Sequence, residues 1–96
     1  MKWLLEHTAK FPKHERFRLA RQIEDALFTF HSCLLQAAKL EKRYYLQLAD
    51  IELEKLRTYL RLAGELNHTK PDQLKFAFEH TTDLGNLLGA WLKLLS

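Results

Sequence analysis

Apolar residues recur along this chain at spacings of three and four, the pattern that places side chains on one face of an α-helix. The first long series consists of Phe17, Ala20, Ile23, Leu27, Phe30, Leu34 and Ala38. The second consists of Tyr45, Ala49, Leu53, Leu56, Leu60 and Ala63. The third consists of Leu74, Ala77, Thr81, Leu84, Leu88, Trp91 and Leu95. The sequence therefore predicts long amphipathic helices, each with one buried face.

Proline and the few glycines punctuate these patterns and mark the helix ends. We predict four helices, over about residues 2–9, 13–39, 42–66 and 70–95. Pro12 suits the opening of the second helix, because the first turn needs no amide donor there. Thr69 stands three residues before Asp72, the spacing of a capping box. Long helices joined by short loops favour antiparallel neighbours, so the predicted fold is all-α: one domain, residues 1–96, forming an up-and-down antiparallel four-helix bundle.

Two further features of the helices bear on their packing. A second apolar series on the long second helix, formed by Leu19, Ala26, Cys33 and Leu40, makes its hydrophobic surface wider than one seam. Such width suits a helix that packs in a bundle and also meets another subunit. Gly85 and Gly89 lie one turn apart, which predicts the close approach of a neighbouring backbone or of a bulky ring such as Trp3 or Trp91.

Length and composition limit the class of protein. The chain has 96 residues and no apolar run near the ~20 residues that a membrane span requires. Lys2 is followed by only three apolar residues, too few for a secretory signal peptide. A single cysteine, Cys33, cannot form an internal disulfide. We therefore expect a cytoplasmic protein.

The net charge of +3 is concentrated in two short segments. Lys10–Arg21 carries a net charge of +4 and Lys39–Arg43 carries +2, while the rest of the chain is net negative. Segregation of this kind is typical of an electrostatic binding footprint. Basic clusters are also common on solvated helix faces, so the charge pattern alone leaves both interpretations open.

No arrangement of residues predicts catalysis. Cys33 lies in an apolar register, which predicts a buried, inert thiol. His31 and Ser32 are adjacent and so point about 100° apart on a helix, the wrong disposition for a base and a nucleophile. The spacing Glu65-x-x-His68 occurs in bundle di-metal sites, but it occurs once here, near a helix end. We expect no catalytic residues, no metal and no cofactor, and a metal-dependent bundle enzyme is the least favoured hypothesis.

Several blocks of sequence resemble one known family. Residues 2–8 (KWLLEHT), 11–17 (FPKHERF) and 23–27 (IEDAL) are similar to the accessory variability determinant, Avd, of diversity-generating retroelements. Residues 53–57 (LEKLR), 59–63 (YLRLA) and 84–93 (LGNLLGAWLK) match the family's third and fourth helices in order and spacing. The Phe-Pro turn is shared with a related group, the bundle proteins encoded in intervening sequences of bacterial 23S ribosomal RNA genes.

The resemblance implies a non-catalytic partner of a retroelement reverse transcriptase. Family members are four-helix bundles that form barrel-like homopentamers, bind the reverse transcriptase and nucleic acid, and support mutagenic copying of template RNA into cDNA for retrohoming. The alternative is a structural or RNA-binding oligomer of the 23S intervening-sequence group. This chain has a shorter first helix than is usual in the family, and Glu41, Asp50 and Glu52 interrupt a region that is often more basic.

Carried onto this sequence, the resemblance implies cations that contact the reverse transcriptase or phosphates. The expected residues are Arg16, Arg18, Arg21, Arg57 and Arg61, followed by Lys13, Lys42 and Arg43. Arginine suits this role because its planar donors bind phosphate or carboxylate bidentately. The competing interpretation is structural, with Arg16 pinning a helix start to a carboxylate and Arg57 pairing with Glu54. A basic face that docks only a protein partner is a further alternative.

Overall fold

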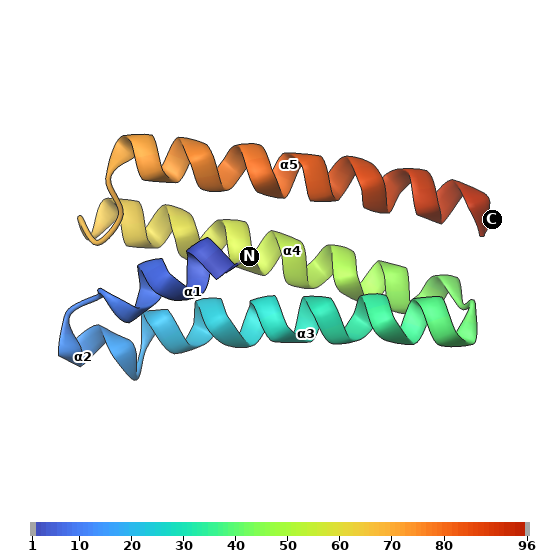
Figure 1. Cartoon of the computed structure of the whole chain (residues 1–96), viewed down its shortest axis with the longest axis horizontal. Helices are drawn as coiled ribbons and strands as arrows, with labels where there is room; N and C mark the ends of the chain where they lie inside the picture. Colours follow the sequence, from blue (N-terminus) through green and yellow to red (C-terminus); the bar gives the residue numbers. More distant parts are fainter. Residues whose placement is uncertain (1, 96) are drawn as a thin grey trace.

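The computed structural model describes residues 2–95, which contain helices and no strand (Figure 1). The helices are α1 (Lys2–Ala9), α2 (Lys13–Arg16), α3 (Leu19–Leu40), α4 (Arg43–Glu65) and α5 (Pro71–Leu94). With α2 as a single turn, α1, α3, α4 and α5 form the four-helix bundle, and its all-α class is as predicted. The predicted domain also includes residues 1 and 96, which lie outside the described residues.

The three long helices form the frame, and α4 lies between α3 and α5 (Figure 1). The consecutive long helices α3, α4 and α5 run antiparallel, as the short connections predict (Figure 1). Helix α1 has only 8 residues, about 12 Å of length, against about 33 Å for the 22 residues of α3. Helix α1 therefore covers only one end of the three long helices, where its Trp3 and Leu4 face α4 and α5.

Helix α4 supplies the centre of the core because it has a long neighbour on both sides. Its six buried side chains, Leu46, Ala49, Leu53, Leu56, Leu60 and Ala63, have no exposed surface. Five of these were predicted from the spacing. Tyr45, the sixth predicted residue, is half-buried, and Leu46 takes the buried position beside it.

The prediction of one continuous helix over 13–39 is wrong. The chain breaks at Phe17 and Arg18, where Arg18 has φ −115° and ψ −94°, and α3 begins after it. Buried Glu15 lies just before the break and pairs with Arg18 within it, which fixes the chain in this turn. Phe17 is consequently out of register with the α3 core and is 75% exposed, although its spacing predicted a buried residue.

The apolar face of α3 also ends differently from the prediction. Ala37 is buried, whereas Ala38, from the first predicted apolar series, and Leu40, from the second, are exposed. A helix has 3.6 residues per turn, so a series written in steps of three and four drifts around the helix over several turns. Of the second apolar series, Leu19, Ala26 and Cys33 are buried.

Helix α5 begins at a different cap from the one predicted. Its N-cap is Lys70, whose backbone N–H donates to Gln73 Oε1 at 2.9 Å, and Pro71 occupies the first helical position. Thr69 lies outside the helix, and its hydroxyl is hydrogen-bonded to His7 Nε2 at 2.8 Å. The threonine joins α1 to the α4–α5 loop and does not cap α5.

The predicted close approach at the two glycines is found at Gly85 and concerns an arginine. A Cβ atom at Gly85 would lie 3.1 Å from Arg57 Nη2, so the missing side chain makes room for a guanidinium from α4. A Cβ at Gly89 would meet nothing within 4 Å. Neither position receives a backbone or a tryptophan ring.

Candidate nucleic-acid and partner interface

The two basic segments of the sequence lie at opposite ends of the bundle. Lys10–Arg21 spans α2 and the start of α3, whereas Lys39–Arg43 forms the turn between α3 and α4 (Figure 1). The 22 residues of α3 separate these ends by about 33 Å. Each chain therefore presents two separate basic regions.

At the α2 end, Lys13 and Arg16 are accessible cations that form no internal ion pair among the described residues. Both side chains are exposed, and neither forms an ion pair within residues 2–95. Arg21 is also exposed, and its Nε lies 3.9 Å from Asp25 Oδ2, a weak surface pair that salt screens. These three side chains can reach an external phosphate or carboxylate without breaking a strong internal contact.

Arg18 has an internal role that the other cations of this end lack. Its Nε lies 2.7 Å from Oε1 of Glu15, whose side chain is only 2% exposed. The two atoms form an ion pair without the alignment of a hydrogen bond. Because a buried carboxylate is costly without a partner, the Arg18 charge stabilises the α2–α3 break.

A buried polar cluster underlies this basic end. His68 Nε2 donates to Glu15 Oε2 at 3.0 Å, and the Thr8 hydroxyl donates to Glu24 Oε2 at 2.6 Å. His7 is buried between the rings of Trp3 and Phe11, and burial, followed by the positive charge of Lys10, lowers its pKa. These contacts tie α1, α2 and the α4–α5 loop together.

No local sequence pattern marks this cluster. Its central contacts join Glu15 to His68 and His7 to Thr69, which are 53 and 62 residues apart. His68, whose spacing from Glu65 resembled half of a di-metal motif, turns to Glu15 instead. Within residues 2–95, no group of three or more His, Cys, Asp or Glu side chains is placed to hold a metal ion.

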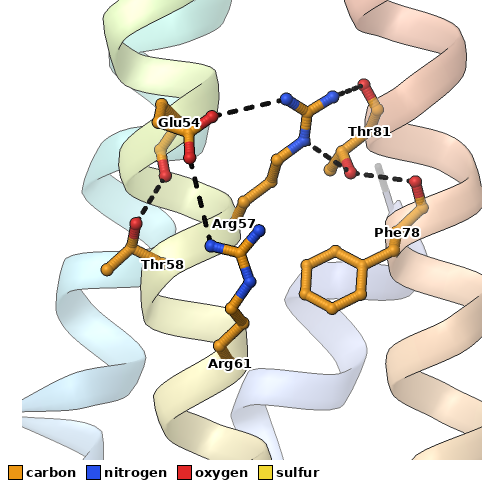
Figure 2. Close-up of polar contacts among 6 residues, drawn as sticks. All are labelled: Glu54, Arg57, Thr58, Arg61, Phe78 and Thr81. Atoms are coloured by element: carbon orange, nitrogen blue, oxygen red, sulfur yellow. Dashed lines mark hydrogen bonds and ion pairs between the residues drawn. The ribbon is translucent and has the colours of Figure 1, made fainter.

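Arg57 joins two helices and is not a free surface cation (Figure 2). Its Nη2 donates to the Thr81 carbonyl at 2.8 Å, and its Nε donates to the Thr81 hydroxyl at 3.2 Å. Nη1 lies 3.5 Å from Glu54, the predicted partner one turn away. The side chain is 23% exposed, and two of its N–H donors bond across from α4 to Thr81 on α5.

We call the contacts of Arg57 with Thr81 the Arg57 clamp. Arg61 lies next to this clamp and remains accessible. Its guanidinium is 5.3 Å from the centre of the Phe78 ring, and its Nη1 is 4.0 Å from Glu54 (Figure 2). The side chain is 55% exposed. The ring and the carboxylate orient Arg61 while leaving donors available to a ligand.

At the opposite end, Lys39, Lys42 and Arg43 are exposed, and none of them forms an ion pair within the described part of the chain. Glu41, between them, has the left-handed backbone conformation, with φ 53°. Its N–H donates to the Ala37 carbonyl at 2.9 Å and ends α3. This turn therefore holds three unpaired cations within five residues.

The described surface contains an apolar pocket with a volume of about 90 Å³, lined by Trp3, Leu4, Leu60, Phe76, Ala77, His80 and Thr81. His80 is its one titratable side chain, which does not provide the nucleophile–base pair of a catalytic site. In residues 2–95 no helix combines the length and the hydropathy of a membrane span.

The described residues form a small helical bundle with exposed cations at both ends. Comparison with family models identifies the particular family: the chain belongs to the bAvd-like family, whose model matches residues 1–95. This is a family of Avd-like non-catalytic accessory proteins. Searches of curated proteins and of solved structures found no match.

Proposed function

We propose that this protein is the accessory subunit of a diversity-generating retroelement, which binds the reverse transcriptase and nucleic acid and supports mutagenic reverse transcription and retrohoming. The bAvd-like match over residues 1–95 is the observation that carries the proposal. The two basic ends support it, because anionic surfaces are the partners that such regions attract. The work would be done in the cytoplasm, the location expected from the sequence.

The cations at the α2 end are the first choice for these contacts. Lys13, Arg16 and Arg21 are exposed and weakly paired or unpaired, so they can contact the polymerase or phosphates directly. Arg18 is 70% exposed and can add to the same surface while it remains paired with Glu15.

The α4 arginines have different parts in the proposal. Arg61 offers a partly exposed guanidinium, and Arg57 shapes this surface by holding Glu54, which also contacts Arg61. Lys42 and Arg43 are the proposed contact residues at the opposite end of the bundle.

The proposed working unit is a homo-oligomer, and the family resemblance favours a pentamer. Large apolar side chains are exposed on each long helix, including Leu35 on α3, Ile51 on α4 and Leu87 on α5. Burial of such side chains between subunits would remove apolar area from water. Five copies would also combine their charges of +3 into about +15 on one particle. Sedimentation equilibrium tests this, since a monomeric mass at all concentrations would contradict the oligomer.

Nucleic-acid binding is tested by titrating labelled RNA and DNA at several salt concentrations. If the basic ends contact phosphates, log K will fall linearly with log salt, by about 0.7–0.9 per phosphate contacted. The absence of measurable binding at low salt would contradict the nucleic-acid part of the proposal.

Polymerase binding is tested by co-purification with the tagged reverse transcriptase of the same element. The double variant Arg16→Glu/Arg21→Glu reverses two accessible cations of the α2 end and spares Arg18, whose loss would leave the Oε1 atom of buried Glu15 without its ion-pair partner. The matched control is Lys70→Glu/Lys75→Glu, which makes the same change in net charge at two exposed positions near the start of α5.

We expect the first variant to lose the reverse transcriptase and the control to retain it. Equal retention by wild type, variant and control would remove the α2 end from the polymerase interface. Equal loss in both variants would show that net charge, and not this surface, governs the interaction.

A further inference from the structure

The turn between α3 and α4 combines exposed cations with an exposed aromatic ring. Tyr44, in the first turn of α4, is 60% exposed and follows Lys42 and Arg43 directly. Lys39 lies at the end of α3 on the other side of the turn. The α2 end has exposed Phe17 among its cations, but there the chain also contains the Glu15 and Asp25 carboxylates that pair with Arg18 and Arg21.

Tyr44 is held in position although its surface is open. Its ring meets the ring of Tyr45 edge to face, with 5.4 Å between centroids and 72° between planes. Tyr45 is half-buried and packs against the hydrophobic core. The contact restricts the Tyr44 ring before any ligand arrives, which lowers the entropy lost on binding.

The cations around Tyr44 are not paired with carboxylates within the described residues. Lys39, Lys42 and Arg43 are exposed and form no ion pair within residues 2–95. The first turn of α4 contains no acidic residue, and no side chain caps it. Glu41 offsets one of the three positive charges, so the turn keeps a net charge of +2, and an anion would be stabilised beside it.

We propose that this turn is a binding site for single-stranded nucleic acid, in which an unpaired base stacks on Tyr44 and the flanking phosphates contact Lys39, Lys42 and Arg43. A tyrosine ring can stack on a base of any sequence, provided that the base is not already paired and stacked within a duplex. The inference rests on the proposed nucleic-acid binding and specifies the form of its ligand. It also assigns template RNA or nascent cDNA to the end of the bundle opposite Arg16 and Arg21.

The decisive variant is Tyr44→Ala, measured by fluorescence anisotropy with a labelled oligothymidylate and with a duplex of the same length. Loss of one stacked base should weaken single-strand binding roughly 5- to 150-fold, the equivalent of about 1–3 kcal/mol. Tyr44→Phe keeps the ring and should bind like wild type. Duplex affinity should change less than about twofold, because paired bases do not stack on the ring.

Phe28→Ala is the matched control, since Phe28 is 58% exposed on α3 and lies away from this turn. It should leave single-strand affinity unchanged. Circular dichroism will show that both alanine variants keep the helical content of wild type, as expected for exposed positions. If Tyr44→Ala binds oligothymidylate as tightly as Phe28→Ala does, the stacking site is excluded.

The phosphate part is measured separately through salt dependence. Replacing Lys39, Lys42 and Arg43 by glutamine should reduce the slope of log K against log salt by about 2, as expected for three phosphate contacts on a single strand. An unchanged slope would contradict contact between these cations and phosphates.

Two other outcomes would overturn the inference in different ways. If wild-type protein binds no oligonucleotide at low salt, the nucleic-acid part of the proposed function fails together with the site. If Tyr44→Ala binds oligothymidylate normally but no longer co-purifies with the reverse transcriptase, the turn belongs to the polymerase interface, and the nucleic-acid site is wrong while the proposed function stands.

Discussion

The Arg57 clamp between α4 and α5 makes the sharpest prediction about stability. Replacing Arg57 by methionine keeps an apolar stem of similar length and removes the guanidinium. The variant loses the 2.8 Å and 3.2 Å hydrogen bonds to Thr81 and the 3.5 Å contact with Glu54. Hydrogen bonds to charged groups contribute about 1.5–3 kcal/mol, and an ion pair with a largely exposed carboxylate adds at most about 1 kcal/mol.

We expect Arg57→Met to lower the free energy of unfolding by about 2–3 kcal/mol, since the longer bond is weak and the retained stem still packs. For a domain of this size that corresponds to a fall in Tm of roughly 10–20 °C. Urea unfolding followed by circular dichroism measures the change. Arg61→Met is the control, and it should cost less than about 1 kcal/mol because Arg61 is half exposed and has only the Phe78 ring and a 4.0 Å contact with Glu54. Equal costs for the two variants would refute the clamp.

Three further predictions follow from backbone conformation and burial. Gly89→Ala should raise the free energy of unfolding by about 1 kcal/mol, because alanine has the higher helix propensity. Gly85→Ala should be less stable than Gly89→Ala by about 1–2 kcal/mol, because its Cβ would displace Arg57. Equal urea midpoints for the two variants would contradict this. Glu41→Gly should stabilise the protein by about 1 kcal/mol, since glycine adopts φ 53° without strain, and a calorimetric Tm no higher than that of Glu41→Gln would contradict it. Burial lowers the pKa of His7, so the unfolded chain binds a proton at this residue more tightly than the folded chain does. Burial of the neutral ring therefore contributes fully to stability above about pH 6.5, and the contribution is lost as the pH falls below that value. His7→Gln should therefore show a smaller loss of stability between pH 7.5 and 5.5 than wild type, and parallel curves would exclude the titration of His7 as its cause.

The regular helices could be predicted from the sequence because their causes are local. The α4 series, from Tyr45 to Ala63, keeps its spacing through about five turns. Helix α4 also packs against a long helix on each side, which determines the face that it buries. The pairing of Glu54 with Arg57 also follows from spacing alone.

The parts that could not be predicted depend on contacts between distant residues. The break after α2 is linked to the burial of Glu15 against His68, 53 residues away, and nothing in the local sequence marks that meeting. In the same way, Arg57 looked like one more exposed cation, because its main partner, Thr81, lies 24 residues away on another helix.

The candidate site was predicted by residue type but not by position. The sum of charges along the sequence located the positive charge in two segments. Only the fold shows that α3 holds these segments at opposite ends of the bundle. It also separates accessible cations such as Arg16 from Arg18, whose charge stabilises a buried carboxylate.

Reconstituted reverse transcription tests the central claim most directly. The reverse transcriptase and template RNA of the same element would be incubated with wild-type protein, with Arg16→Glu/Arg21→Glu, with Lys70→Glu/Lys75→Glu, or with no addition, and the full-length cDNA would be quantified. The proposed accessory role predicts abundant cDNA with wild type and with the Lys70/Lys75 control, and little with the Arg16/Arg21 variant or without the protein. The same cDNA yield in all four reactions would contradict it.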